Sequence, residues 1–199
     1  MRLHLASVWA LMHNLLMRRI VFAIAEDKPR IEKTLGRAIN DNEYEQMKEP
    51  SLDCFSSRLD SMIEARQLLV EKENGIIVGA IEYIHDDGKL LLGENATQRQ
   101  IYDLLEQIDF KGEATIVIRT IFVDPTAIGK GAAKELISTL FAQNKETSFL
   151  LQVNRRNTRA ISFFKKNGFY EIPYPIANPD NLFMAKPYVP QGLCRNAFW

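Results

Sequence analysis

The chain has 199 residues, of which 46% are apolar and 25% charged, and this is enough for one compact domain with a sizeable core. Lysine plus arginine and aspartate plus glutamate both number 25, so the formal net charge is zero. No overall basic field therefore favours binding to nucleic acid or to an anionic membrane. The cysteines, Cys54 and Cys194, have no metal-ligand spacing and are too few for a disulfide framework, which fits a reducing, cytoplasmic setting without a metal.

The N-terminal segment over residues 1–16 contains an apolar stretch that is too short to span a bilayer and is interrupted by His4, Ser7 and His13. Met17 begins the run MRRIVFAIAEDKP, which is typical of the start of a domain. We therefore expect an N-terminal extension over 1–16, one domain over 17–186 and a C-terminal tail over 187–199.

The first half of the chain predicts a strand, two helices and a β-hairpin. Asp27 is placed to cap the first helix, and Ser51 opens the second, in which Cys54 has apolar neighbours. Asn74-Gly75 predicts a tight hairpin, because both residues readily take the positive φ values of a two-residue turn. The strands are expected over 19–25, 67–72 and 76–85.

A helical insertion is expected over about 86–112, after which the pattern of strands and helices resumes. The next strand, 114–123, leads into a helix from about Gly131 to Asn144, and a second helix ends at Gly168. Further strands are expected over 148–153, 169–174 and 182–186. This order predicts a mixed α/β fold with helices on both faces of the sheet.

The segment between strand 114–123 and the next helix is the strongest candidate for an anion site. Gly129 and Gly131 flank Lys130 directly before the helix. Glycines let the backbone approach a ligand, and the first turn of a helix offers unpaired N–H groups at the positive end of its dipole. A pyrophosphate fits such a loop, although a glycine pair before a helix is equally compatible with a simple turn. The fingerprints of nucleoside-triphosphate and dinucleotide loops are absent.

Two segments, VDPTAIGKGAA and NTRAISFFKKNGF, resemble the GNAT superfamily of N-acyltransferases in order and spacing. In the first, Ile128, Gly131 and Ala133 take the three signature places of the family loop. The second, over 157–169, is similar to the family's Asn-x-x-Ala-x-x-Phe-Tyr-x-x-x-Gly-Phe segment. The resemblance implies a mixed, mostly antiparallel central sheet with helices on both faces, and acetyl-CoA as cosubstrate.

The resemblance also implies which residues hold the cosubstrate. Main-chain groups of Ile121 and Val123 pair with the pantetheine arm, and Asn157 lies near that arm, although it also fits a plain helix cap. The pyrophosphate then faces the loop residues Gly129, Lys130, Gly131, Ala132 and Ala133.

Two positions depart from the family pattern. Ile128 stands where the family has Gln or Arg, which removes a polar side chain but leaves the backbone donors. Phe164 stands where the family often has the tyrosine that protonates the departing thiolate, so the acid role is in doubt.

Acetyl transfer to an amine also requires a base, because a free alkyl amine has a pKa of about 10.4 and is protonated at neutral pH. The strand 114–123 carries no carboxylate in the stretch Ile118-Arg119-Thr120. The candidates are Glu82 and His85 on the preceding strand, with Glu113 behind them. Glu82 also fits a solvent-facing strand residue, and His85 a residue that precedes a turn.

The function that the resemblance implies is acetyl transfer from acetyl-CoA to a primary amine by direct transfer in a ternary complex. Cys54 is expected to pack within its helix, which disfavours a covalent acyl-enzyme. The acceptor is an amine-bearing small molecule or a protein amine, and a homodimer stays open. The alternatives are a GNAT-like domain that binds CoA as a sensor or interaction module without turnover, and an α/β domain that binds no CoA.

Overall fold

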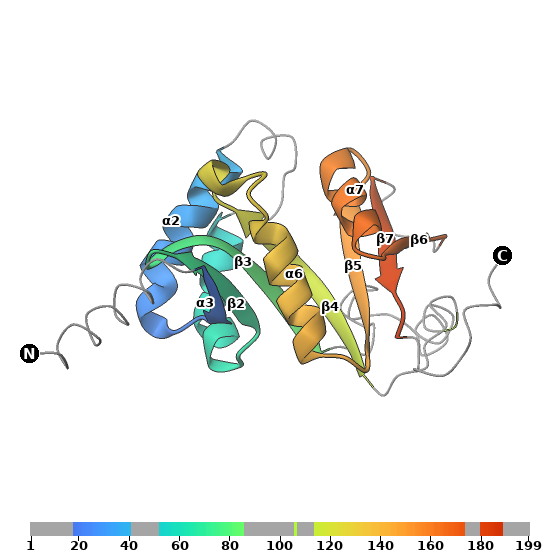
Figure 1. Cartoon of the computed structure of the whole chain (residues 1–199), viewed down its shortest axis with the longest axis horizontal. Helices are drawn as coiled ribbons and strands as arrows, with labels where there is room; N and C mark the ends of the chain where they lie inside the picture. Colours follow the sequence, from blue (N-terminus) through green and yellow to red (C-terminus); the bar gives the residue numbers. More distant parts are fainter. Residues whose placement is uncertain (1–17, 41–51, 86–105, 107–113, 174–179, 189–199) are drawn as a thin grey trace, which may run out of the picture. The chain divides into compact units, whose positions relative to one another are not determined.

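The computed structural model describes residues 18–40, 52–85, 106, 114–173 and 180–188 (Figure 1). The predicted extension over 1–16, most of the insertion over 86–112 and most of the tail over 187–199 lie outside these ranges. Ser51 and Glu113 also lie outside them. Within the described part of the chain, no helix is both long enough and apolar enough to cross a membrane.

The helices and strands follow the predicted order, with ends that shift by one to a few residues. Asn74 and Gly75 form the predicted hairpin turn, with φ values of 53° and 75°. The elements are β1 (Arg19–Phe22), η1 (Ala25–Asp27), α2 (Lys28–Ile39), α3 (Leu52–Glu64), β2 (Leu68–Glu73), β3 (Ile76–His85), β4 (Ala114–Val123), η2 (Pro125–Ala127), α6 (Ala132–Gln143), β5 (Thr147–Asn154), α7 (Thr158–Lys166), β6 (Tyr170–Ile172) and β7 (Asn181–Lys186).

The strands form a seven-stranded sheet in the order β1-β2-β3-β4-β5-β7-β6. The pairs β1–β2, β2–β3, β5–β7 and β6–β7 are antiparallel, whereas β4 and β5 are parallel. The expectation of a mixed, mostly antiparallel sheet with helices is therefore confirmed. The chain divides into two compact units: the first comprises the residues up to Glu82 and Thr120–Ala142, and the second the remainder.

In the first unit, the two faces of β2 and β3 have different neighbours. Val70 and Ala80 lie opposite each other and belong to a buried apolar cluster with residues of α2 and α3. The next pair, Glu71 and Gly79, points to the other face because side chains alternate along a strand. On that face, a Cβ atom added to Gly79 would lie 3.2 Å from Leu136 of α6. The glycine therefore lets α6 pack closely on β3.

Asp27 does not cap α2 through its side chain, contrary to the prediction. Its carboxylate is buried, accepts hydrogen bonds from Lys72 Nζ at 2.7 Å on both oxygens, and accepts one from the Ile24 N–H at 3.2 Å. The residue thus stabilises the junction between β1 and α2 by tying it to β2, which local sequence does not reveal.

In the second unit, β5 and β7 form an antiparallel pair that is buried along most of its length. Helix α7 is followed by Gly168, whose φ of 88° ends the helix as predicted. The short strand β6 then pairs with β7.

Candidate functional site

The loop from β4 to α6 is held at its start by Asp124. The carboxylate of Asp124 accepts hydrogen bonds from the N–H and the hydroxyl of Thr126, at 3.0 and 2.6 Å. It also forms an ion pair with Arg37 of α2 at 2.6 Å, and the Asp124 N–H donates to the carbonyl of Val78 at 2.8 Å. The start of the loop is therefore tied to both α2 and β3.

Both glycines of the loop have backbone conformations that disfavour other residues. Gly129 has a φ of 78° and Gly131 a φ of 93°. Among the residues that the structure describes, no heavy atom lies within 4 Å of a Cβ atom added to either glycine, so the described part of the chain leaves the space beside each glycine open. The glycines are thus required by backbone geometry and leave room for a ligand to approach the main chain.

The backbone donors of the loop are divided between internal turns and the start of α6. The N–H groups of Ile128 and Lys130 donate to carbonyls within the loop, those of Pro125 and Ala127. The first hydrogen bond of the α6 turn runs from the Glu135 N–H to the carbonyl of Gly131 at 3.0 Å. The N–H groups that precede Glu135, those of Ala132, Ala133 and Lys134, consequently have no acceptor inside the helix.

These donors refine the predicted anion site. The N–H of Lys130, one of the residues predicted to face the pyrophosphate, closes a turn by donating to the carbonyl of Ala127 at 3.2 Å. Ala132 and Ala133 lie in the first turn of α6, where the helix dipole is positive. Ile128 is half-buried and has an extended conformation.

The carboxylate of Glu82 is the centre of a polar network that includes Arg58 of α3 and Thr120 of β4. Its side chain is fully buried, so the interpretation as a solvent-facing residue is wrong. The hydroxyl of Thr120 on β4 donates to Glu82 Oε2 at 2.9 Å. Arg58 of α3 donates through Nη2 to both carboxylate oxygens, at 3.3 and 3.4 Å. Three elements therefore converge on one buried carboxylate.

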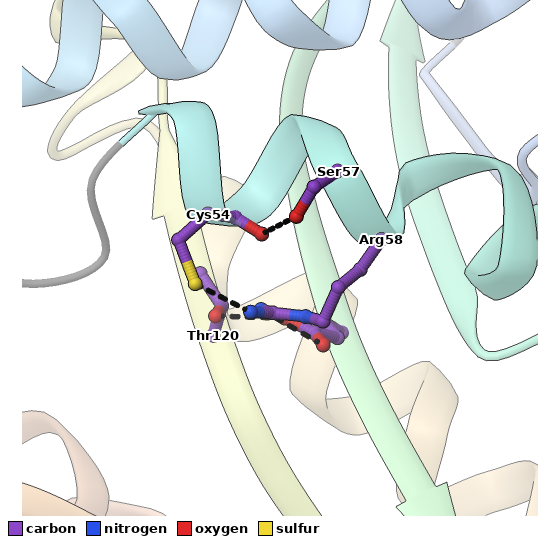
Figure 2. A network of polar contacts seen from close by, with 5 residues as sticks. Cys54, Ser57, Arg58 and Thr120 are labelled. Atoms are coloured by element: carbon purple, nitrogen blue, oxygen red, sulfur yellow. Dashed lines mark hydrogen bonds and ion pairs between the residues drawn. The ribbon is translucent and has the colours of Figure 1, made fainter.

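Cys54 lies next to this network and is exposed, so the expectation that it packs within its helix is wrong. Arg58 Nη1 lies 3.0 Å from the sulfur of Cys54, one helical turn away on α3. In Figure 2 the guanidinium of Arg58 extends from the helix towards both Cys54 and Thr120. Arg58 thus joins the surface of α3 to the buried carboxylate.

The second candidate base, His85, lies at the exposed end of β3 in the second unit. Its ring meets that of Tyr83 edge-on, with centroids 6.5 Å apart. Glu82 belongs to the first unit, so the two candidate bases lie in different units.

The predicted residues of α7 have structural partners of their own. Asn157 caps the helix by accepting a hydrogen bond from the Ala160 N–H at 2.9 Å. Phe164 is buried and meets Phe163 and Phe169 edge-on, with centroids 5.3 and 5.4 Å apart. Both residues lie in the second unit.

Ile121 and Val123 lie near the end of β4. The parallel pairing of β4 with β5 ends at Ile118, opposite Leu151, and β4 continues to Val123. Both residues are half-buried and belong to the first unit.

The sequence analysis did not identify Arg58 or Thr120 as site residues. The alternation of side chains along β4 could have indicated that Thr120 faces the core. Thr120 stands two residues before Phe122, which lies in the apolar cluster beneath α2 and α3. A hydroxyl at a core-facing position needs a partner, and Glu82 supplies it. Arg58 follows Phe55 by three residues, so it borders the buried stripe of α3.

A further pair of charges lies close to the glycine loop. Glu71 of β2 is buried, and this burial raises the pKa of its carboxyl, with Arg18 at 3.6 Å opposing the shift and Glu135 and Glu73 adding to it. The pKa of Arg18 is raised by its hydrogen bond to Glu73. Within the described ranges, no group of three or more His, Cys, Asp and Glu side chains could hold a metal ion.

Comparison with known proteins relates this geometry to one family. The sequence model of the Acetyltransferase (GNAT) family matches residues 36–169, which contain both the glycine loop and the Glu82 network. No curated protein matches the chain by sequence.

Solved structures with this fold include three acetyltransferases. PaiA N-acetyltransferase from Thermoplasma acidophilum, in complex with coenzyme A, has 15% identity and a TM-score of 0.62 over 86% of this chain and 99% of that one. The ribosomal-protein-S18-alanine N-acetyltransferase from Escherichia coli has 17% identity and a TM-score of 0.58, and the match covers 92% of this chain and 100% of that one. Naa50 from Arabidopsis thaliana, in complex with the bisubstrate analogue CoA-Ac-MVNAL, has 16% identity and a TM-score of 0.56. The match covers 84% of this chain and 96% of that one. At these identities the similarity establishes the fold alone.

Proposed function

Since this chain belongs to the GNAT family of acetyltransferases, we propose that it transfers an acetyl group from acetyl-CoA to a primary amine. Transfer is direct, within a ternary complex of protein, acetyl-CoA and amine. The observation that carries the proposal is the glycine loop, in which Gly129 and Gly131 have positive φ values and open space directly before α6.

The pyrophosphate of acetyl-CoA binds at this loop, from Ile128 to Ala133. The N–H groups of Gly131, Ala132 and Ala133 donate to the phosphate oxygens, and the positive end of the α6 dipole favours their charge. Buried Leu136 and Ile137 pack α6 in place, so the donors are oriented before the ligand arrives. Main-chain groups of Ile121 and Val123 then pair with the pantetheine arm.

Glu82 is the base in this proposal, and Thr120 connects it to the acceptor amine. The amine nitrogen attacks the thioester carbonyl, a C–N bond forms, and the C–S bond breaks with release of the CoA thiolate. The amine proton passes to the Thr120 hydroxyl oxygen while the Thr120 proton passes to Glu82 Oε2, 2.9 Å away. Glu82 is preferred to His85 because the Thr120 hydroxyl gives it a hydrogen-bonded path towards the acceptor, whereas His85 lies at the exposed end of β3.

The thiolate needs no strong acid to depart. A thiol with a pKa near the cysteine value of about 8.5 is a tolerable leaving group, and water can return the proton. Phe164, at the position of the family tyrosine, lies buried between Phe163 and Phe169 and supplies no proton. A protein amine or a small-molecule amine remains the acceptor class, and the proposed setting is cytoplasmic.

Gly131→Ala tests the loop, with Gly75→Ala as its matched control. Both glycines have positive φ and open space at the Cβ position, so both substitutions introduce similar backbone strain. We expect Gly131→Ala to weaken CoA binding at least tenfold in calorimetry and Gly75→Ala to leave it unchanged. Equal CoA affinity in folded Gly131→Ala would contradict the proposed position of the pyrophosphate.

Thiol release from acetyl-CoA in the presence of amino acids, polyamines, amino sugars and peptides tests turnover. Release with one of these classes, dependent on Glu82, supports the enzyme. Tight CoA binding without release with any of them favours the alternative, a CoA-binding sensor or interaction domain, which the lack of a hydroxyl at Phe164 supports. Absence of CoA-induced thermal stabilisation would exclude both the acetyltransferase and the CoA-binding domain without turnover.

A further inference from the structure

Arg18, which directly precedes β1, reaches the glycine loop from a distant part of the sequence. Its Nη1 donates a hydrogen bond of 2.6 Å to the main-chain carbonyl of Lys130, across 112 positions. Both residues belong to the first unit. A side chain outside the loop thus holds the loop's backbone at its centre, between Gly129 and Gly131.

The guanidinium of Arg18 is itself fixed by two carboxylates of β2. Its Nε donates to Glu73 at 3.0 Å, and Nη1 lies 3.6 Å from Glu71, whose side chain is fully buried. Two anchors reduce the rotamers available to a long side chain, so less conformational entropy is lost when it holds a third group. The contact with Lys130 is therefore made by an already oriented donor.

The orientation of the Lys130 carbonyl determines that of the next N–H group. The peptide between Lys130 and Gly131 is planar, and in a trans peptide the C=O and N–H bonds point in opposite directions. Because the carbonyl points at Arg18, the N–H of Gly131 points away from it. Gly131, with a φ of 93°, could otherwise take many conformations in which this donor turns elsewhere.

We propose that Arg18 is a positioning residue of the CoA site, which fixes the Lys130–Gly131 peptide so that the Gly131 N–H faces the pyrophosphate. Its positive charge also offsets the negative end of the Lys130 carbonyl beside the bound phosphates. Ile128 brings no polar side chain to this loop, so the orientation of the loop's backbone donors matters more for binding. This inference rests on the proposed function, because it assumes that acetyl-CoA binds at the loop.

Kinetics with two acetyl donors separate positioning from a structural role. Acetyl-CoA carries the pyrophosphate, whereas S-acetylpantetheine has the same thioester and pantetheine arm without phosphate. We expect Arg18→Met to raise the KM for acetyl-CoA about tenfold or more, as the loss of a hydrogen bond from a charged donor predicts. The kcat at saturating acetyl-CoA and the kcat/KM for S-acetylpantetheine should stay near the wild-type values.

Arg18→Lys and Arg30→Met are the controls. Lysine keeps the charge but not the fork of donors, so the KM for acetyl-CoA should lie between the wild-type and Arg18→Met values. Arg30 Nη1 donates to the carbonyl of Gly75 at 3.3 Å in the hairpin turn, so Arg30→Met loses a comparable contact away from the loop. Arg30→Met should change neither the KM for acetyl-CoA nor the kcat/KM for S-acetylpantetheine.

Two outcomes would overturn the inference while leaving the proposed function intact. If Arg18→Met binds CoA as tightly as the wild type in calorimetry, Arg18 does not position the loop. If Arg18→Met lowers kcat/KM by the same factor with acetyl-CoA and with S-acetylpantetheine, the role of Arg18 is structural. Failure of the wild-type protein to bind CoA at all would instead refute the proposed function, and this inference with it.

Discussion

The hydroxyl of Thr120 donates a 2.9 Å hydrogen bond to the carboxylate of Glu82, which is fully buried on the neighbouring strand. Burial separates the carboxylate from bulk solvent, whereas Thr120 retains slight exposure. A proton that leaves an amine on the α3 face can thus reach Glu82 through one intervening hydroxyl. This relationship makes the hydroxyl as important to the proposed reaction as the carboxylate.

Thr120→Val removes the hydroxyl with little change in shape and should lower kcat by about 10²-fold or more, the lower range for general base catalysis. The affinity for CoA should be unchanged, because the glycine loop does not involve this residue. Glu82→Gln should lower kcat by a similar factor. Steady-state kinetics with the best acceptor amine measure both effects.

Thr120→Ser is the control for this pair, since it keeps the hydroxyl and should retain most of the activity. The double variant Thr120→Val/Glu82→Gln should be no slower than the worse single variant, because the two residues act in one proton path. Full activity in Thr120→Val would exclude a proton path through this hydroxyl.

Gly79→Ala should destabilise the protein by about 1–3 kcal/mol, the usual cost of overpacking. The added Cβ atom would lie 3.0 Å from the Phe122 carbonyl oxygen of β4 and 3.2 Å from the Leu136 side chain of α6, so the packing of β4 and α6 around β3 would have to adjust. Because α6 carries the loop donors, CoA affinity should fall as well. Urea unfolding and calorimetry measure the two effects.

Gly36→Ala is a contrasting substitution within α2. Among the described residues, its Cβ atom would meet only Leu52, at 4.0 Å, and alanine favours the helix over glycine by about 0.8–1 kcal/mol. This variant should therefore be more stable than the wild type. A stable Gly79→Ala protein with normal CoA affinity would show that α6 tolerates displacement.

Glu71 should make stability depend on pH. Burial, the largest cause, raises its pKa above the ordinary value of 4.5, so the native state binds this proton more tightly than the unfolded state does. As the pH rises from about 4.5 through the raised pKa, the native state loses this contribution to its stability. Relative to the wild type, Glu71→Gln should become increasingly more stable over the same window.

Thermal unfolding of wild type and Glu71→Gln across that pH range shows whether the stability of the variant relative to wild type rises with pH, as predicted. Thr34→Val changes another buried side chain of the first unit, one that does not titrate. The difference in stability between this variant and wild type should therefore be the same at every pH. A difference for Glu71→Gln that is constant or reversed with pH would contradict the raised pKa.

The sequence predicted most of the elements because their signals are local. The Asn74-Gly75 turn follows from the conformational preferences of its own two residues, and β4 over Ala114–Val123 follows from one apolar run. The glycine loop was also found locally, because glycines before a helix are visible in a few consecutive letters. Its assignment to acetyl-CoA needed the family resemblance.

The rest depends on pairs that are distant in sequence. Asp27 looks like a helix cap until Lys72, 45 positions later, is placed beside it. Glu82 looks like a solvent-facing strand residue until α3 covers it with Arg58. Arg18 carries no motif, and only the folded chain brings it to Lys130. A charged residue in a short sequence window is by default exposed, and only tertiary contacts overturn that expectation.

Strand β2 carries two buried residues of opposite charge in succession, and this arrangement guards against misalignment during folding. Lys72 meets Asp27 on the α2 side, whereas Glu71 points to the α6 side near Arg18. A slip of β2 by one residue would exchange the two faces. Glu71 would then confront the carboxylate of Asp27, and Lys72 would confront Arg18 and the positive start of α6. Each misplaced charge would meet its own sign in a buried setting, so the wrong alignment is disfavoured on both faces of the strand at once.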